Sequence, residues 1–219
     1  MESKKLKVKG LLLDLDGTIV DSREAYLEAA KTAFAKMGRK KVDEKTVTEI
    51  PRRLEQGLTI HDLVKGFNIK KFLEAYLNAY YQSTATKTKP LPNVSETLAE
   101  LSERMKLALV TMRYVPKRYV IDELENFGLA KYFKYVMTAL NTPFPKPSPE
   151  SLKKCARQIS LKTHDCAVVG DSVTDMRAGK AAGAKTIAVL SGIFTRKELE
   201  REKPDLILES VNQLPDFLE

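Results

Sequence analysis

The chain has 219 residues, of which 43% are hydrophobic and 30% are charged, and its 37 basic and 29 acidic residues give a net charge of +8. This composition is that of an ordinary globular protein with one medium domain, or with a core and a small insert. The positive charge is spread along the chain without an arginine-rich helix, so we expect an anionic small-molecule partner and no nucleic acid.

Membrane and secretory features are not expected. The apolar stretch Leu11–Val20 is interrupted by two aspartates and is too short to span a bilayer, and no cleavable signal pattern follows the basic N-terminus. Cys155 and Cys166 form no CxxC pair, which favours free thiols in a reducing compartment. We therefore expect a cytoplasmic protein without a membrane partner, either a monomer or a homodimer.

The first predicted strand, Gly10–Asp14, is an apolar run that leads into two acids, Asp14 and Asp16, and then Gly17 and Thr18. Alternate residues of a strand face opposite sides, so the second carboxylate must lie where the chain has begun to turn, which Gly17 permits. Ligands bind at the carboxyl ends of parallel strands, where two acids suit a nucleophile or metal ligand and a proton carrier. The alternative is a surface turn with two solvated aspartates.

Residues 21–85 show helical periodicity and no convincing strand. Asp21 with Glu24 predicts a capping box at the start of the first helix, and Asn68 is placed to cap the last one. The hydrophilic segment 83–90 predicts a linker that returns the chain to a different pattern. These residues are expected to form a small helical bundle.

The rest of the chain alternates strand-like and helix-like segments, which is typical of a parallel α/β sheet. The predicted strands after the first are Leu107–Thr111, Tyr135–Thr138, Cys166–Gly170, Thr186–Leu190 and Leu206–Leu208. We therefore predict an α/β core made of residues 1–20 and 86–219, with residues 21–85 as a helical insert.

Three further polar signals lie at the ends of these segments. One strand closes on Thr111; Lys146 stands among three prolines that restrict its backbone; and Asp171 follows a buried strand, with Asp175 four residues later at a helix start. Each has an ordinary alternative, namely a β-forming threonine, a solvated lysine and a helix N-cap.

Taken together and in this order, DxDGT, hydrophobic-Thr, Lys and GDxxxD resemble the four motifs of the haloacid dehalogenase superfamily, over essentially the whole chain. The helical insert looks like the type-1 cap of its phosphoglycolate phosphatase-like members. The resemblance implies a Rossmann-like parallel sheet core with an inserted α-helical cap. It also implies a Mg²⁺-dependent phosphatase that hydrolyses a small organic phosphomonoester, phosphoglycolate or a similar metabolite.

The resemblance makes Asp14 the nucleophile, which forms an aspartyl-phosphate, and Asp16 the group that protonates the leaving alkoxide and then deprotonates water. The phosphoryl oxygens would be held by backbone amides and by two side chains, from the residues Leu15, Asp16, Thr111, Met112 and Lys146.

The implied Mg²⁺ ligands are the Asp14 and Asp171 carboxylates, the Asp16 carbonyl and waters. Asp175 would bind the metal, directly or through water, or would orient Lys146.

Two places depart from the usual family pattern. Met112, Arg113 and Tyr114 follow Thr111 where relatives place an asparagine or a small residue, so Arg113 is a candidate for selecting the leaving group. Arg52 and Arg53 lie approximately where related caps have a substrate-reading loop, and they could bind a second anionic group of the substrate. A solvated charge pair at a helix start is the alternative for these two.

Other functions remain open on the same motifs. A sugar-phosphate mutase of the β-phosphoglucomutase kind uses the same core and cap, and a catalytically silent binding protein could keep the scaffold. A dehalogenase is disfavoured because it needs no acid at Asp16, and no cap lysine is marked out for a phosphonatase.

Overall fold

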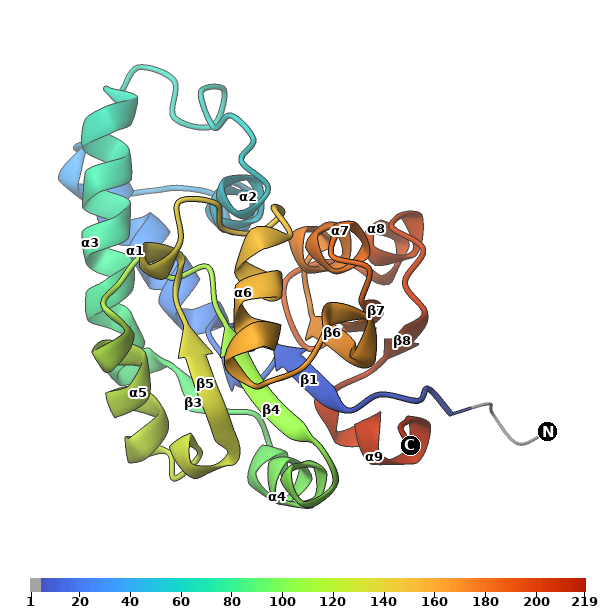
Figure 1. Ribbon diagram of the computed structural model, residues 1–219. Coiled ribbons are helices and arrows are strands. Elements are labelled where there is room, and N and C mark those ends of the chain that lie inside the picture. Colours follow the sequence, from blue (N-terminus) through green and yellow to red (C-terminus); the bar gives the residue numbers. More distant parts are fainter. Residues whose placement is uncertain (1–4) are drawn as a thin grey trace. The chain divides into compact units, whose positions relative to one another are not determined.

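The computed structural model describes residues 5–219, which divide into two units (Figure 1). One unit consists of the described residues up to Val20 together with Pro90–Glu219, and the other consists of Asp21–Lys89. The chain passes between them at two short strands that pair with each other, β2 (Val20–Asp21) and β3 (Lys89–Pro90).

The first unit is built on a six-stranded parallel sheet with the strand order β5-β4-β1-β6-β7-β8. Its strands are β1 (Gly10–Leu13), β4 (Lys106–Val110), β5 (Phe133–Met137), β6 (Cys166–Gly170), β7 (Lys185–Val189) and β8 (Leu206–Leu208). Each of the six strands predicted from the sequence is present, with its ends shifted by two residues at most. The predicted α/β fold with a parallel sheet is thus confirmed.

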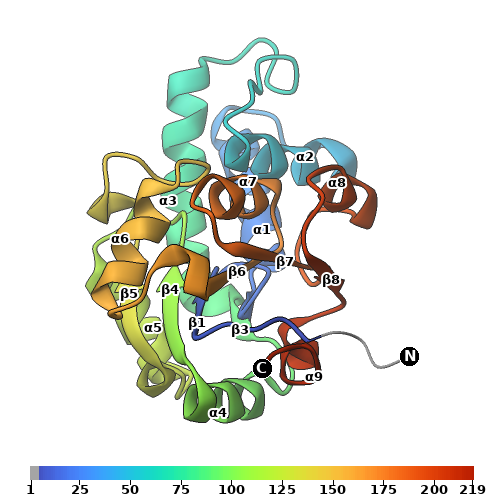
Figure 2. The same ribbon diagram turned by 45° about the vertical axis from the view of Figure 1, so that its right-hand side comes forward.

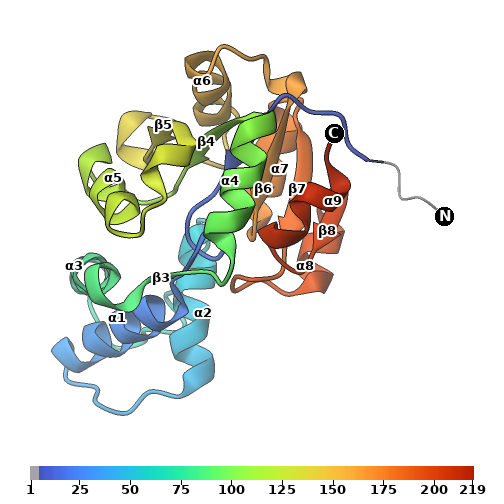
Figure 3. The same cartoon turned by 90° about the horizontal axis from the view of Figure 1, so that it is seen from below.

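Helices cover both faces of this sheet. They are α4 (Val94–Arg104), α5 (Lys117–Asn126), α6 (Glu150–Gln158), α7 (Val173–Ala181), α8 (Arg196–Arg201) and α9 (Leu214–Phe217), with short 3-10 turns at Ala130–Tyr132, Ala139–Asn141, Thr163–Asp165 and Val211–Gln213. Helices α4 and α9 pack beside each other (Figures 2 and 3).

The central strand β1 is buried on both sides, which explains its unbroken run of leucines. Leu11 and Leu13 share an apolar cluster with residues of α4, α5 and α9. Leu12 points the other way, into a cluster with Leu152 of α6 and Ala178 of α7. Burial from both faces holds β1 in place and so fixes the position of the polar residues that follow it.

The second unit contains three helices, α1 (Arg23–Lys36), α2 (Glu44–Glu55) and α3 (Ile69–Lys87). Small residues on α1 allow α3 to pack closely, and two aromatic pairs join these helices: Tyr26 with Tyr80, and Phe34 with Phe72, at 4.9 and 4.8 Å between ring centroids. The structure therefore has a helical insertion after β2, as predicted.

Two local predictions about this unit were wrong and one is confirmed. Helix α1 begins after Ser22, and the Asp21 carboxylate accepts hydrogen bonds from the backbone and side chain of Arg23 instead of forming a capping box with Glu24. The predicted linker 83–90 is helical as far as Lys87. The Asn68 side chain does cap α3, by accepting from the Lys71 backbone.

The linker prediction failed because polar side chains can be satisfied within a helix. The hydroxyl of Thr84 donates to the Tyr81 carbonyl, and that of Thr88 donates to the Thr84 carbonyl at 2.5 Å. Both threonines are buried, and the first proline after the tyrosines comes only at Pro90. The structure also places no helix within residues 5–219 that is both long and apolar enough to cross a lipid bilayer.

The two cysteines are expected to be unreactive in the folded protein. Both are free and buried, and burial raises the pKa of the Cys155 thiol to about 12 and that of Cys166 to about 11. Because the thiolate is the reactive form, a thiol reagent such as Ellman's reagent should modify neither residue in native protein and both after unfolding in guanidinium chloride. Rapid labelling of the native protein would contradict this packing.

Candidate active site

The site begins where β1 ends, at the loop that carries Asp14 and Asp16. The Asp14 backbone still pairs with β6 by donating to the Val169 carbonyl at 2.9 Å, and the chain turns beyond it. Gly17 takes a φ of +77°, which favours glycine, and its N–H donates to the Val20 carbonyl at 2.8 Å. The second acid thus lies in the turn, as predicted.

Strand register brings the other polar motifs to the same edge. Leu13 of β1 is opposite Leu109 of β4 and Val169 of β6, so the residues after these strands emerge together. Thr111 and Asp171 are two such residues, and both are buried.

Lys146 lies between two of the carboxylates. Its side chain is almost completely buried, and its Nζ is 2.6 Å from Asp14 Oδ1 and 2.5 Å from Asp175 Oδ1. Asp175 also belongs to a capping box at the start of α7, where its Oδ2 accepts from the Ser172 hydroxyl at 2.7 Å. The lysine that the sequence placed among three prolines therefore reaches the acid after β1.

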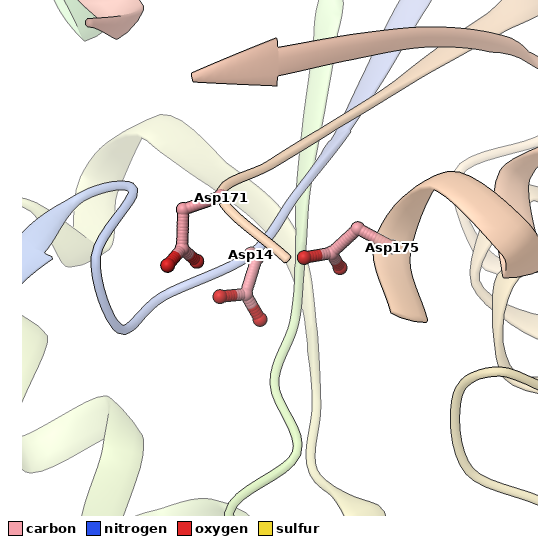
Figure 4. A group of neighbouring side chains, drawn as sticks. All are labelled: Asp14, Asp171 and Asp175. Carbon is pink, nitrogen blue, oxygen red and sulfur yellow. The ribbon is translucent and has the colours of Figure 1, made fainter. Parts of the chain in front are cut away.

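Three carboxylates form a compact group in the site. Asp14, Asp171 and Asp175 each offer an oxygen, and these oxygens all lie within 4.8 Å of one another. In Figure 4, Asp14 lies between the other two, and the Asp175 carboxylate extends from α7 towards it. All three residues are buried.

This group fits a hard divalent cation. Its donors are carboxylate oxygens, the ligands that Mg²⁺ prefers. The backbone around them is shaped to leave the acids room: a Cβ on Gly192 would lie 1.6 Å from Asp171 Oδ2, one on Gly17 would lie 2.6 Å from the same atom, and one on Gly170 would lie 2.2 Å from Asp175 Cγ. Side chains at these three positions would displace the carboxylates, so the cradle depends on glycine.

The charges in the site influence one another strongly. Burial is the largest influence on the pKa of Asp14; the charge of Lys146 lowers it, those of Asp175 and Asp16 raise it, and the result is a value of about 7. Burial alone would lower the pKa of Lys146, but Asp14 and Asp175 outweigh it and raise that pKa above its ordinary value. The lysine therefore stays protonated, and a cation beside Asp14 would favour its ionised form.

The residues after β4 form a second part of the site. The Thr111 hydroxyl accepts a hydrogen bond from the Arg113 backbone at 3.2 Å, and Met112 between them is half-buried. Arg113 is 5% exposed, and its guanidinium binds both carboxylate oxygens of Asp16, with Nε–Oδ2 and Nη2–Oδ1 distances of 2.8 and 2.7 Å. The same guanidinium pairs with Glu123 on α5.

Sequence reasoning did not find Glu123 or the contact between Arg113 and Asp16. Only the departure from the family pattern at Arg113 drew attention to this part of the chain. Nothing in the spacing of positions 16, 113 and 123 indicates that they meet, because the contact depends on the pairing of β1 with β4 and on the packing of α5. The predicted role of Arg113 in substrate choice stays a prediction.

Arg52 and Arg53 belong to the helical unit. They lie in the last turn of α2 and not in a loop. This helix begins after its cap, Asp43, and continues through Pro51 as far as Glu55. Arg53 pairs with Glu49 at 3.1 Å and with Asp62 at 2.5 Å, and Arg52 pairs with Glu49 at 3.4 Å. Their predicted role as substrate-reading residues is not tested by these contacts.

Comparison with known proteins gives consistent results. Residues 11–189 match the family described as haloacid dehalogenase-like hydrolase. The chain is 31% identical over 217 residues to a phosphoglycolate phosphatase of Vibrio parahaemolyticus, covering 94% of each protein, and 29% identical to phosphoglycolate phosphatase 1 of Pseudomonas aeruginosa, covering 93% of this chain and 77% of the other. A haloacid dehalogenase-like hydrolase from Streptococcus pneumoniae has the same fold, with a TM-score of 0.79 at 20% identity over 95% of this chain and 97% of the other.

Proposed function

This chain belongs to the haloacid dehalogenase-like hydrolase family, and from that membership we propose that it is a Mg²⁺-dependent phosphatase for a small organic phosphomonoester, phosphoglycolate or a similar metabolite. The observation that carries the proposal is the buried group of Asp14, Asp171 and Asp175 with Lys146 inserted between two of them. Similarity over 93% or more of this chain to two proteins named phosphoglycolate phosphatase supports the substrate class.

Asp14 is proposed as the nucleophile. A carboxylate oxygen of Asp14 bonds to phosphorus while the bond from phosphorus to the leaving oxygen breaks, and Asp16 gives its proton to that oxygen. Water then attacks the aspartyl-phosphate and loses a proton to Asp16, while the bond from phosphorus to Asp14 breaks. The products are the alcohol and inorganic phosphate, and both acids return to their starting state.

Lys146 and Thr111 are proposed to bind the phosphoryl oxygens, together with backbone N–H groups of the loop at Leu15 and Asp16 and of Met112. Lys146 suits this role because its ammonium is buried and has a raised pKa, so its charge persists at neutral pH. Its contact with Asp175 also supports the proposal that Asp175 orients this lysine.

Mg²⁺ would be held by the carboxylates of Asp14, Asp171 and Asp175 and by the Asp16 carbonyl, and it would reduce the repulsion between the carboxylate nucleophile and an anionic phosphate.

The first experiment is a turnover assay on p-nitrophenyl phosphate with Mg²⁺ and with a chelator, followed by a panel of phosphorylated metabolites scored by release of inorganic phosphate. We expect Mg²⁺-dependent phosphate release, with two- and three-carbon anionic phosphates among the better substrates. Conversion of one phosphate ester into its isomer without phosphate release would instead identify a mutase, and inactivity on the whole panel would contradict the proposal.

We propose that the helical insert, residues 21–85, acts as a cap that reads the part of the substrate beyond the phosphate, with Arg52 and Arg53 as candidates for an anion. Replacing both by alanine should lower kcat/KM for the best anionic substrate about 10- to 150-fold, the value of one charge-assisted contact, and leave p-nitrophenyl phosphate turnover nearly unchanged.

The matched control replaces Lys70 and Lys71, which are exposed near the start of α3 in the same unit, and should change neither substrate. Since Arg53 pairs with Glu49 and Asp62, an equal loss on both substrates would assign the arginines to the folding of the helical unit and end the substrate-reading proposal.

A further inference from the structure

Arg113 has a rigid place between the sheet and α5. Its backbone N–H donates to the Thr111 hydroxyl, and its carbonyl accepts from the Ala139 N–H at 3.0 Å. The backbone is therefore held by hydrogen bonds on both sides of the Arg113 Cα atom. Its side chain is 4% exposed. A buried arginine in a fixed backbone has little freedom to reach towards a substrate in solvent.

The guanidinium of Arg113 binds two carboxylates at the same time, one on each of two edges. One edge, Nε and Nη2, faces the two oxygens of Asp16 in a fork, and Nη1 pairs with Glu123, whose side chain is 13% exposed. A planar guanidinium in such a fork sets the direction of a carboxylate as well as its distance, which a lysine ammonium cannot do. Glu123 in turn prevents the guanidinium from rotating.

Asp16 needs such a support because of where it lies. It follows the end of β1, in the turn at Gly17, where no regular sheet pairing fixes it beyond an isolated bridge to Val20. A proton donor that is misplaced by about 1 Å loses on the order of 100-fold in rate, so a mobile Asp16 would be a poor acid.

We propose that Arg113, braced by Glu123, is a positioning residue that sets the direction of the Asp16 carboxylate for proton transfer to and from the leaving oxygen. This inference rests on the proposed phosphatase function and gives Arg113 a task different from direct contact with the substrate. To act as the acid, Asp16 releases one carboxylate oxygen from the fork and takes up a proton from solvent on it. That proton goes to the leaving oxygen, while the other Asp16 oxygen keeps its bond to the guanidinium and the carboxyl group stays oriented.

The test compares Arg113→Gln, Arg113→Lys and Glu123→Gln with wild type on two substrates that differ in leaving group. Phosphoglycolate has a poor leaving group that needs the acid, and p-nitrophenyl phosphate has a good one that needs it little. For Arg113→Gln we expect kcat on phosphoglycolate to fall about 10- to 100-fold with KM unchanged, and p-nitrophenyl phosphate turnover to fall less than about threefold.

Arg113→Lys should recover only part of the loss, since it restores the charge without the fork, and Glu123→Gln should show the same selectivity with a smaller loss. Arg118→Gln is the matched control, because it makes the same substitution of an arginine nearby in the sequence. Arg118 lies on α5, is exposed, and pairs with Asp122 and Glu125. Its kinetics should equal those of wild type.

A double mutant separates the inference from other causes. If Arg113 acts through Asp16, then Asp16→Asn combined with Arg113→Gln should be no slower on phosphoglycolate than Asp16→Asn alone. A raised KM for phosphoglycolate would instead make Arg113 a substrate-binding residue. Faster turnover by Arg113→Gln would show that the fork restrains Asp16, and equal losses on both substrates would show that Arg113 serves the folding of the protein. Any of these three results overturns the inference.

Thermal unfolding of the four proteins of this double-mutant comparison tests the fork by a measurement that does not depend on enzyme activity. The melting temperatures of wild type, Asp16→Asn, Arg113→Gln and the double mutant should be clearly non-additive. An inactive wild type with this coupling would overturn the proposed function and leave the fork established, whereas additive melting temperatures would overturn the fork itself. Should Arg113→Gln not fold, Glu123→Gln carries the substrate comparison.

Discussion

Replacing Asp14 by asparagine is expected to lower kcat for phosphomonoester hydrolysis by about 10⁴-fold or more, the usual cost of removing the nucleophile of a covalent mechanism. Asparagine has the shape of aspartate, so its side-chain oxygen can still accept from Lys146 and the site keeps its packing. What is lost is the anionic oxygen that attacks phosphorus. The loss should therefore be the same for p-nitrophenyl phosphate and for phosphoglycolate.

The measurement is phosphate release at saturating substrate, with Asp122→Asn as the control because Asp122 is a half-buried residue of α5 that pairs with Arg118 outside the site. Melting temperatures of the two variants show whether the fold is retained. Activity of a folded Asp14→Asn variant above about 1% of wild type would exclude Asp14 as the nucleophile.

Removal of the metal should have an effect of similar size. When ionised, Asp14, Asp171 and Asp175 carry three negative charges and Lys146 carries one positive charge, so two negative charges in this group remain to be balanced. A divalent cation supplies that balance, and without it an anionic phosphate would be repelled from the nucleophile. We expect a chelator to reduce turnover at least about 100-fold, Mg²⁺ to restore it, and Ca²⁺, with its larger and looser coordination, to restore it poorly.

Asp171 gives the sharpest variant for this prediction, because it belongs to the carboxylate group with Asp14 and Asp175 and its Oδ2 accepts from the Ile193 backbone at 3.2 Å. Asp171→Asn should raise the Mg²⁺ concentration for half-maximal activity about 10- to 100-fold. Calorimetric titration with Mg²⁺ gives the same shift without substrate. Full activity after exhaustive chelation, or unchanged Mg²⁺ binding by Asp171→Asn, would remove the proposed metal site.

The parts of this structure that could be predicted from sequence are those with local causes. Strands buried on both faces, such as Leu11–Leu13, read as continuous apolar runs, and the polar residues at their ends follow from the edge of the sheet at which parallel strands finish. Asp14, Asp171 and Asp175 could therefore be placed in one site, and the structure does bring these three together.

The parts that could not be predicted depend on long-range contacts. Arg113 reaches Asp16 because of the pairing of β1 with β4, and no pattern in the sequence indicates that contact. Lys146, which reaches Asp14 and Asp175, is assigned to the site from sequence only through the resemblance to the family. The predicted capping box at Asp21 failed because two groups compete for its carboxylate. The neighbouring Arg23 is a stronger hydrogen-bond partner than the backbone N–H groups of the helix terminus. At Asp16 the deciding partner is a charged side chain far away in the sequence, whereas at Asp21 it is a charged neighbour two residues later that the capping-box pattern does not take into account.

The order of strands has a consequence for synthesis of the protein on the ribosome. Strand β1 is made early, but both strands that pair with it, β4 and β6, lie far downstream, at Lys106–Val110 and Cys166–Gly170. The helical unit Asp21–Lys89 is continuous in sequence, so it has all its own packing partners as soon as it has emerged. We therefore expect the helical unit to fold on the nascent chain while β1 is still unpaired. The three carboxylates of the site can come together only after the segment through Asp175 has been made.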